Sequence, residues 1–436
     1  MTEDDSQDTE TLFARLCALF AQDPLIDEIG LVFGVEEAEL TVENAFFLEE
    51  HKLGVAFSAG PQLFRQARTR FHELNPLLLS NGIGSDSNVE LTEQLIDCTR
   101  AILLISADFY TAWNTRKELV CCGVLDALEE TRFCDLVFTL HPKSIDTWAY
   151  RRWLATRLLS PSAPSSSLLT SDALSSFYER QLDVCSLLAE QKPRNYHAWS
   201  FRHWIVSQLP LEALEGELQR MQQWCASHIT DHSGWNHRQH VVNVAVKRMR
   251  EANPNAPCKQ LVVDEYAFLS KIMASYPQHE ALWCHRRFVI QLVLRELNDD
   301  DGKDGFDLAL LNQRVSELEA KVKLAEAKTA ARADALRAES LLLSEWQTVA
   351  ESLHALNSNS AHLALLAIID EIEIAWSFQN RFSRRFALWC LERVRRALSS
   401  LVGSSSTELQ SLANAMRARL SIQDPLLQDL WDNKRS

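Results

Sequence analysis

The feature that most constrains the fold of this chain is a tryptophan followed three residues later by an arginine, which occurs five times. The pairs are Trp113/Arg116, Trp148/Arg151, Trp199/Arg202, Trp235/Arg238 and Trp283/Arg286. Because the chain has only 12 tryptophans, five such pairs indicate an internal repeat. Successive tryptophans are 35, 51, 36 and 48 residues apart, and the two longer intervals contain insertions at 160–167 and 253–257. These spacings are typical of helix–turn–helix repeats.

Three of the five units share a longer motif around the tryptophan. They read HPKSIDTWAYRRW, KPRNYHAWSFRHW and YPQHEALWCHRRF, with a proline six residues before the tryptophan and an aromatic residue five after it. Ser144, Asn195 and Asp231 each lie four residues before a repeat tryptophan. These residue types cap the N-termini of helices. We therefore expect the motif to mark the start of the second helix of each unit.

The tryptophan and the arginine of each pair are expected to act as joints between helices. Residues three apart lie on one face of a helix. An indole buries a large area between stacked helices, and a guanidinium hydrogen-bonds carbonyls or acids of an adjacent repeat. We therefore interpret the ten repeat residues as structural and not as catalytic groups.

Outside the motifs, the chain also shows helical spacing of its apolar residues. It has few glycines and prolines, and few windows alternate as half-buried strands do. The prediction is an all-α fold, an α-α superhelix of helical hairpins with extra N- and C-terminal helices. We expect a helical extension over 1–90, about five repeats over 91–297, a linker over 298–305 and a helical region over 306–436. Within that last region, 306–340 is a charged helix that packs on its own domain or forms a coiled-coil arm, and a degenerate sixth repeat follows from about 361.

Composition excludes some classes of function. The net charge of −15 argues against nucleic acid as the main partner, and no apolar run is long enough for a membrane span. The acidic N-terminus lacks the pattern of a signal peptide, so we expect a cytoplasmic protein whose ten scattered cysteines are reduced and mostly buried. His228, His232, His237 and His240 are close in sequence, but they surround a repeat arginine, so packing is favoured over metal binding.

The repeat motif resembles that of the α subunits of protein prenyltransferases, over about residues 95–295, and PRNYHAWSFRHW at 193–204 is a close match. Further stretches resemble a divergent α-type member, distinct from the α subunits of farnesyltransferase and of the Rab enzyme. These stretches are DPLIDEIGLV (23–32), HKLGV (51–55), DFYTAWNTRKEL (108–119), DHSGW (231–235) and HEALWCHRR (279–287). The resemblance implies a crescent of hairpins around a separate β subunit that carries zinc, the isoprenoid pocket and most catalytic residues. No catalytic residue, metal or cofactor is then expected in this chain.

The resemblance also implies that a few side chains of the α subunit face the isoprenoid diphosphate. By repeat order the diphosphate lysine matches Lys143, and by motif similarity Arg194 is the other candidate. Tyr196 and His197 match aromatic and imidazole positions of the family that lie near the same mouth of the isoprenoid pocket. The second unit departs from the family, because it reads Lys-Ser-Ile at 143–145 where the family has Lys-Asn-Tyr. Independently, a cation beside the free N–H groups of a helix start suits a phosphate, whereas the alternative is that both cations are exposed turn residues.

Two functions are therefore compatible with the sequence. The first is an α-type subunit, inactive alone, of a cytosolic geranylgeranyltransferase with the β subunit of the Rab enzyme. Its substrates would be trafficking proteins with C-terminal cysteines, such as a SNARE or a small GTPase. The second is a non-enzymatic scaffold that binds small GTPases or membrane-trafficking factors. The β subunit, the choice between farnesyl and geranylgeranyl, and the protein substrate stay open.

Overall fold

The computed structural model describes residues 10–81, 88–160, 171–253 and 258–299, together with scattered positions between 368 and 393. The chain divides into two compact units, Met1–Leu209 and Pro210–Ser436, each treated by itself below. This division falls inside the repeat array, whereas the sequence predicted boundaries near 90 and 297. The predicted helix or coiled-coil arm at 306–340 lies outside the described residues.

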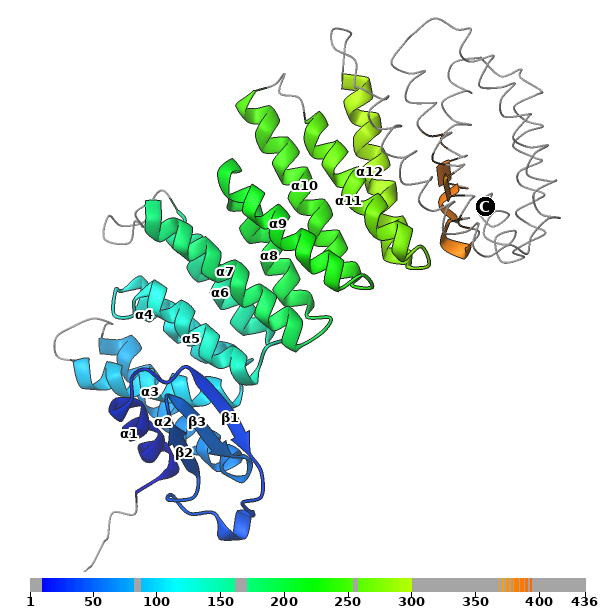
Figure 1. Ribbon diagram of the computed structural model, residues 1–436. Helices are drawn as coiled ribbons and strands as arrows, with labels where there is room; N and C mark the ends of the chain where they lie inside the picture. Colours follow the sequence, from blue (N-terminus) through cyan, green and yellow to red (C-terminus); the bar gives the residue numbers. More distant parts are fainter. Residues whose placement is uncertain are drawn as a thin grey trace, which may run out of the picture. The chain divides into compact units, whose positions relative to one another are not determined.

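In chain order, the N-terminal unit begins with a helix, a small mixed sheet and a second helix (Figure 1). The elements are α1 (Leu12–Gln22), β1 (Glu28–Val32), η1 (Glu37–Glu39), β2 (Phe46–Glu49), β3 (Lys52–Ala56), η2 (Phe57–Ala59) and α2 (Gly60–Asn81). The strand order is β1-β3-β2, with β1 parallel and β2 antiparallel to β3. The expectation of an N-terminal extension made only of helices was therefore wrong for 28–56.

Short strands explain why the sheet was missed. Each strand has four or five residues, too few to show a convincing period of two. Its apolar side chains nevertheless alternate, since Ile29, Leu53 and Val55 are buried on one face. Between β2 and β3, Glu50 and His51 have positive φ angles of 46° and 66°, as a two-residue hairpin turn requires.

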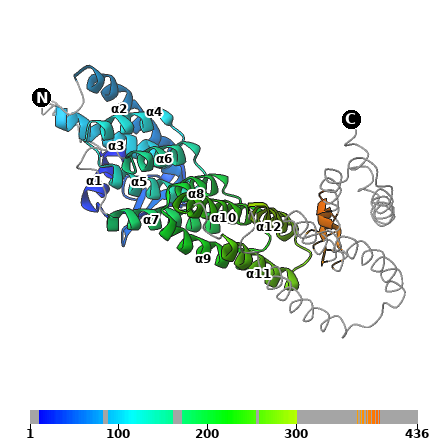
Figure 2. The same cartoon turned by 90° about the horizontal axis from the view of Figure 1, so that it is seen from above.

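Three helical hairpins follow in the same unit. They are α3 (Val89–Ile105) with α4 (Tyr110–Cys121), α5 (Ala127–Leu140) with α6 (Ile145–Leu158), and α7 (Ser171–Gln191) with α8 (Tyr196–Gln208). Each repeat tryptophan is the fourth residue of a second helix, and the side chains of Ser144 and Asn195 cap α6 and α8 as predicted. Figures 1 and 2 show α5, α6, α7 and α8 lying side by side.

The second unit continues the pattern with α9 (Leu211–Ser227), α10 (His232–Ala252), α11 (Lys259–Ser275) and α12 (Glu280–Asp299). The side chain of Asp231 caps α10, as expected. Since α12 reaches Asp299, the first two residues of the predicted linker are helical. Asn380 donates to Pro277 O at 2.8 Å, and the ring of Phe386 packs on Trp283, so part of the suspected sixth repeat contacts the fifth.

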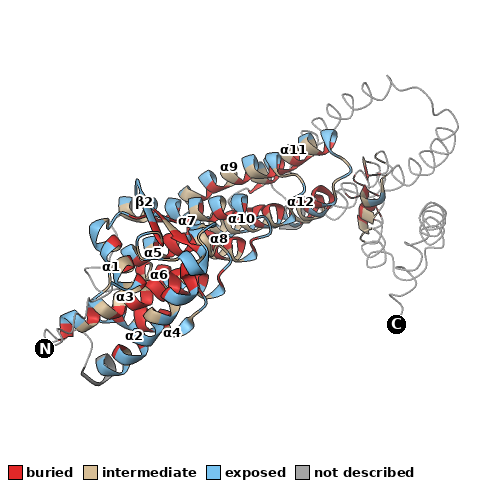
Figure 3. Cartoon of the chain, turned by 90° about the horizontal axis from the view of Figure 1, so that it is seen from below, coloured by how far each residue is buried: buried red, intermediate tan, exposed pale blue. Residues whose placement is uncertain are grey.

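Tryptophans connect successive hairpins within each unit. The indole N–H donates to the carbonyl six residues earlier, from Trp113 to Ala107 at 2.7 Å and from Trp148 to Pro142 at 3.0 Å. The residue two positions after a tryptophan packs on the tryptophan of the preceding repeat, as Tyr150 does on Trp113. Buried residues accordingly line the faces by which neighbouring helices meet (Figure 3). Among the described residues, no helix is long and apolar enough to cross a membrane.

Candidate functional site

The four candidate residues lie in or just after two turns of the N-terminal unit. One turn joins α5 to α6 and carries Lys143, and the other joins α7 to α8 and carries Arg194. The carbonyl of Pro142 accepts from the Trp148 indole of its own repeat at 3.0 Å and from Asn195 Nδ2 of the next repeat at 2.8 Å. This shared acceptor fixes the two turns beside each other.

Lys143 reaches across to the second turn. Its Nζ lies 3.3 Å from Pro193 O, and both Lys143 and Arg194 are exposed. Tyr196, the first residue of α8, is 75% exposed, and its ring meets His197 edge-on at 5.8 Å between centroids. The structure therefore places the two cations, the phenol and the imidazole at one end of α6 and α8.

The electrostatics of the two helix starts differ. At α6, Asp108 Oδ1 accepts from Ser144 Oγ at 2.7 Å and from the Asp146 N–H at 3.2 Å. Burial, together with the charge of Asp108, raises the pKa of Asp146. The N–H groups expected to be available beside Lys143 are thus partly used, and an acid lies next to them.

At α8 the surroundings favour an anion. The first turn of α8 contains no acidic residue, and the positive end of its helix dipole adds to the charge of Arg194. Lys143 extends towards this turn, so its charge also adds to the start of α8. Of the two helix starts, α8 is the one suited to a phosphate.

A row of exposed apolar residues accompanies the cations. Tyr110, Ile145 and Tyr196 each lie three residues before a repeat tryptophan, begin their helices, and are 65%, 62% and 75% exposed. Ile145 is the position where the prenyltransferase family has tyrosine, so the second repeat lacks a hydroxyl donor there. Sequence reasoning missed Tyr110, although its constant offset from the tryptophan was a usable signal.

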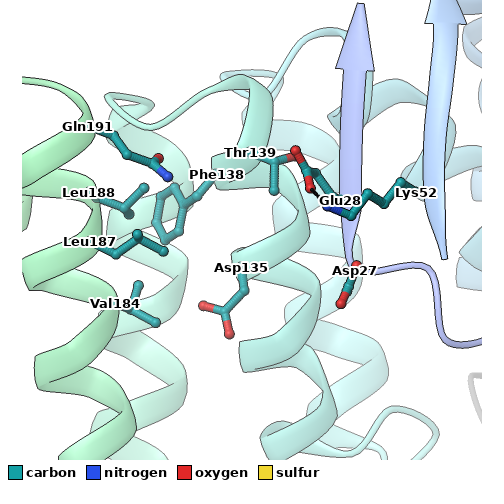
Figure 4. Close-up of a pocket in the computed structure, with 10 residues that line it drawn as sticks. All are labelled: Asp27, Glu28, Lys52, Asp135, Phe138, Thr139, Val184, Leu187, Leu188 and Gln191. Carbon is teal, nitrogen blue, oxygen red and sulfur yellow. Dashed lines mark ion pairs between the residues drawn. The ribbon is translucent and has the colours of Figure 1, made fainter. Parts of the chain in front are cut away.

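A groove of about 330 Å³ lies near the same end of the helices, between β1, β3, α5 and α7 (Figure 4). Phe138, Leu187 and Leu188 form its apolar part. Asp135 on its wall accepts from Arg180 at 2.6 Å and is also paired with Arg151. The sequence did not predict this groove, because it depends on β1 lying beside α5.

The ten repeat residues lie inside the protein, whereas Lys143, Arg194 and Tyr196 are exposed. Arg151 donates to Thr131 O of its own hairpin at 3.1 Å and to Gln181 of the next hairpin at 2.8 Å. All ten are buried: Trp113, Arg116, Trp148, Arg151, Trp199, Arg202, Trp235, Arg238, Trp283 and Arg286. The Trp148 indole donates to Pro142 O from inside and so supports the turn that carries Lys143. This arrangement is the one expected for structural joints.

Arg202 is 2% exposed and bonds to the first helix of its own hairpin. Its Nη1 donates to Leu182 O at 3.3 Å and to Ser186 Oγ at 2.5 Å, and both acceptors belong to α7. The bond to Leu182 O matches that of Arg151 to Thr131 O, since each acceptor lies 20 residues before its arginine. These bonds tie the second helix of each hairpin to its first.

Buried acids and amides near the arginines follow a rule that sequence reasoning missed. One of them stands 18 residues before each of four tryptophans, namely Glu130, Gln181, Glu217 and Glu265. Glu130 accepts from Arg116, Gln181 from Arg151 and Glu265 from Arg238. The constant offset was visible in the sequence and was a usable signal.

The histidines and cysteines have ordinary surroundings. His237 is buried, and its Nε2 lies 2.9 Å from Glu217 Oε1. Within the described ranges, no group of three or more His, Cys, Asp or Glu residues is arranged to hold a metal ion. All ten cysteines are free thiols and six are buried, as the sequence predicted. Burial raises the pKa of Cys98 to about 12, so this thiol is a poor nucleophile.

Stacked hairpins with capped second helices and buried tryptophan–arginine pairs define a repeat protein of the prenyltransferase α-subunit type. The family described as "Protein prenyltransferase alpha subunit repeat" matches residues 127–158, 178–209, 214–244 and 262–293. These four matches fall on the α5/α6, α7/α8, α9/α10 and α11/α12 hairpins. The predicted all-α superhelix is confirmed, with the small sheet as its one β element in the described chain.

Comparison with known proteins then gives the particular family. "Protein prenyltransferase alpha subunit repeat-containing protein 1" of Danio rerio is 33% identical over 307 residues, which cover 63% of this chain and 70% of the relative. Its human counterpart is 30% identical over 313 residues, covering 63% and 75%. "Geranylgeranyl transferase type-2 subunit alpha" of Sus scrofa is 24% identical over 215 residues, covering 46% and 34%. The chain belongs to the family of protein prenyltransferase alpha subunit repeat-containing proteins, as its motifs predicted.

Proposed function

We propose that this chain is a non-catalytic α-type subunit of a cytosolic heterodimeric protein prenyltransferase. A separate β subunit would hold the zinc ion, the isoprenoid and the catalytic residues. The observation that carries the proposal is the convergence of Lys143 and Arg194 at the start of α8, with Lys143 Nζ 3.3 Å from Pro193 O. The similarity to a subunit named for geranylgeranyl transfer supports a geranylgeranyl group as the isoprenoid. The substrates would be C-terminal cysteines of trafficking proteins, such as a SNARE or a small GTPase.

Two cations at this position would act on the leaving group. When a thiolate attacks the isoprenoid, the carbon–oxygen bond breaks and negative charge accumulates on the departing diphosphate. Charge-assisted hydrogen bonds from Lys143 and Arg194 strengthen as that charge grows, so they stabilise the transition state more than the ground state. Each such bond is worth roughly 1.5–3 kcal/mol.

Tyr196 and His197 would complete the donor set. The exposed phenol of Tyr196 projects from the first residue of α8, and the imidazole of His197 follows it. Ile145 cannot donate a hydrogen bond from the neighbouring turn. The contribution of this chain to stabilising the departing diphosphate would therefore depend mainly on its two cations, Lys143 and Arg194.

The experiment is single-turnover prenyl transfer by the chain reconstituted with the β subunit of the Rab geranylgeranyltransferase. Lys143→Ala and Arg194→Ala should each slow transfer about ten- to a hundredfold, and Lys143→Glu should be slower still because it repels phosphate. Lys192→Ala is the matched control, since Lys192 is an exposed cation of the same turn region outside the proposed set. Binding of the two subunits is measured separately and should not change.

Two results would count against the proposal in different ways. Wild-type rates in both alanine variants and in their double variant would exclude these residues from the diphosphate site. Failure of the wild-type chain to bind any prenyltransferase β subunit would remove the subunit function itself.

A non-enzymatic scaffold for small GTPases or membrane-trafficking factors is the second candidate. The observation that favours it is Ile145, an exposed apolar residue where a prenyltransferase α subunit has tyrosine. Such a scaffold would bind a purified GTPase without a β subunit, and Ile145→Ser would weaken that binding. Undiminished binding by Ile145→Ser would argue against this alternative.

A further inference from the structure

The sheet of the N-terminal unit has one face turned away from the core. Ile29, Leu53 and Val55 are buried on the inner face. The residues between them belong to the outer face, where Gly30 and Gly54 are paired and contribute no side chains of their own. A Cβ built on Gly30 would meet no atom within 4 Å, so this part of the outer face is open.

Three phenylalanines of the sheet and of the segments that follow it are exposed: Phe47 lies on β2, and Phe33 and Phe57 come directly after β1 and β3. Phe33, Phe57 and Phe47 are 72%, 59% and 47% exposed, and the rings of Phe33 and Phe57 stack at 5.3 Å between centroids. A Cβ on Gly54 would lie 2.9 Å from Val32 Cγ2 and 3.4 Å from Phe47 Cβ, so Val32 and Phe47 flank Gly54 from both neighbouring strands. We call Val32, Phe33, Phe47 and Phe57 the aromatic patch. Apolar side chains exposed together in this way mark interaction surfaces.

The chain around the aromatic patch is strongly acidic. Residues 16–51 contain no lysine or arginine, and they contain nine acids: Asp23, Asp27, Glu28, Glu36, Glu37, Glu39, Glu43, Glu49 and Glu50. In the part of the chain that the structure describes, two of the nine are in ion pairs, Asp23 with His51 and Glu28 with Lys52. The six from Glu36 to Glu50 are exposed. A partner of this surface must therefore be basic.

The edge strand β2 indicates the form of the partner. The order β1-β3-β2 puts β2 at the edge of the sheet opposite β1, which packs beside α5. In a hairpin with a two-residue turn, Glu49 and Phe47 bond to β3, and the peptide groups of Phe46 and Leu48 point outward. Among the described residues, no hydrogen bond to these outward peptide groups is recorded. A free edge of this kind accepts an extended segment as an additional strand.

We propose that β2 and the aromatic patch bind an extended segment of a partner protein, with apolar residues at alternate positions and lysine or arginine at both ends. The apolar side chains would lie on Phe47, because a strand added to β2 runs about 5 Å from it. The cations would meet Glu49 and Glu50 at one end of β2 and Glu43 at the other. Two copies of this acidic surface would repel each other, which disfavours self-association as the alternative. The inference rests on the sheet alone and is independent of the turns at Lys143 and Arg194.

The first test measures binding of a fluorescent peptide, Lys-Arg-Phe-Thr-Val-Lys-Arg, to the full chain. We expect saturable binding that weakens at least about tenfold in Phe47→Ser, since this ring is 47% exposed on β2 and its loss should leave the fold intact. Tyr110→Ser is the matched control, because Tyr110 is an exposed aromatic residue on α4. Equal affinity in Phe47→Ser, an equal loss in the control, or no saturable binding by the wild type would overturn the proposal.

A second set of measurements tests the charge and the strand. The triple variant Glu43→Gln/Glu49→Gln/Glu50→Gln should weaken binding at low salt, whereas Glu73→Gln/Glu90→Gln/Glu129→Gln, at exposed acids on α2, α3 and α5, should not. A peptide N-methylated at its central threonine keeps its charges but cannot donate there, and should bind at least about tenfold more weakly. Unchanged affinity in either case would contradict the proposed mode. A dimer of the wild type that Phe47→Ser dissociates would overturn the proposal and identify a second copy as the occupant.

Discussion

Arg116 of α4 and Glu130 of α5 lie opposite each other in a two-point ion pair, with Nη2 2.6 Å from Oε1 and Nε 2.8 Å from Oε2. Both side chains are buried, and the Tyr150 hydroxyl donates to the same carboxylate at 2.7 Å. Because α4 ends one repeat and α5 begins the next, this pair joins neighbouring hairpins. The second unit repeats the arrangement with Arg238, Glu265 and His285.

The first prediction tests this joint. Glu130→Ala should lower the free energy of unfolding of the N-terminal unit by about 3–5 kcal/mol, because it leaves a buried guanidinium without its counter-charge. Glu129→Ala is the matched control, since the neighbouring Glu129 forms an exposed pair with Arg132 and should cost less than about 1 kcal/mol. Urea unfolding measures both variants. Similar losses of unfolding free energy in Glu130→Ala and Glu129→Ala would show that the buried pair contributes no more to stability than the exposed one.

The same joint should tolerate replacement of both charges. Arg116→Met/Glu130→Leu removes the pair while filling much of its volume, so most of the stability lost in Glu130→Ala should return. Tyr150 then lacks its acceptor, and we expect recovery to be incomplete. Urea unfolding of the double variant beside Glu130→Ala is the measurement, and a double variant less stable than the single one would contradict the argument.

A third prediction concerns the tryptophan of the second repeat. Trp148 packs on Phe138 and Phe201, with ring centroids 4.3 and 5.4 Å apart, and donates to Pro142 O. Trp148→Ala should therefore cost about 3–5 kcal/mol. Tyr196→Ala removes an aromatic ring that is 75% exposed and should change thermal stability little. Equal shifts in melting temperature would place Trp148 outside the core.

The fourth prediction is a pH dependence in the second unit. Burial lowers the pKa of His285, and its hydrogen bond to Glu265 only partly opposes this. The unfolded chain therefore binds a proton below about pH 6.5 that the folded chain does not bind, so stability should fall as the pH is lowered from 7 to 5. His285→Phe, which copies Phe201 at the equivalent position of α8, should reduce this dependence. His72→Gln, at an exposed site on α2, should not.

Glu265 titrates in a lower pH range than His285, so the effect of the histidine can be measured apart from acid unfolding. Burial alone would raise the pKa of Glu265, but the hydrogen bond from His285 and the charge of Arg238 outweigh it and lower the pKa to about 2. The stability that this carboxylate contributes is present above its unfolded pKa and disappears only as the pH falls from about 4.5 towards 2. Urea unfolding at pH 7, 6 and 5 thus measures the histidine. Identical losses in the wild type and His285→Phe would contradict its assignment.

The last prediction separates stability from activity at Arg194. Its φ of 62° is the left-handed conformation that glycine adopts without strain. Arg194→Gly should therefore stabilise the N-terminal unit by up to about 1 kcal/mol while it slows prenyl transfer as Arg194→Ala does. Thermal melting and single-turnover transfer by the heterodimer measure the two effects. A variant that loses both stability and activity would indicate a structural role for the arginine.

Local residue patterns determined much of this fold. The capping residues Ser144, Asn195 and Asp231 and their fixed distance to a tryptophan located three helix starts correctly, because a helix N-terminus depends on hydrogen bonds within a few residues. The repeat spacing likewise predicted stacked hairpins. The candidates Lys143 and Arg194 came from the family resemblance, which gave their positions in sequence and left open whether their side chains meet.

Only the tertiary structure decided how distant segments combine. The sheet forms because β1 pairs with β3 across a long connection. Strands of five residues are too short for the sequence pattern to predict that pairing. Lys143 contacts the next turn because Asn195 and Trp148 share the carbonyl of Pro142. The acidic start of α6 likewise results from Asp108 of a preceding repeat. Such contacts join residues tens of positions apart, and their energy depends on burial and geometry that exist only once the helices have packed.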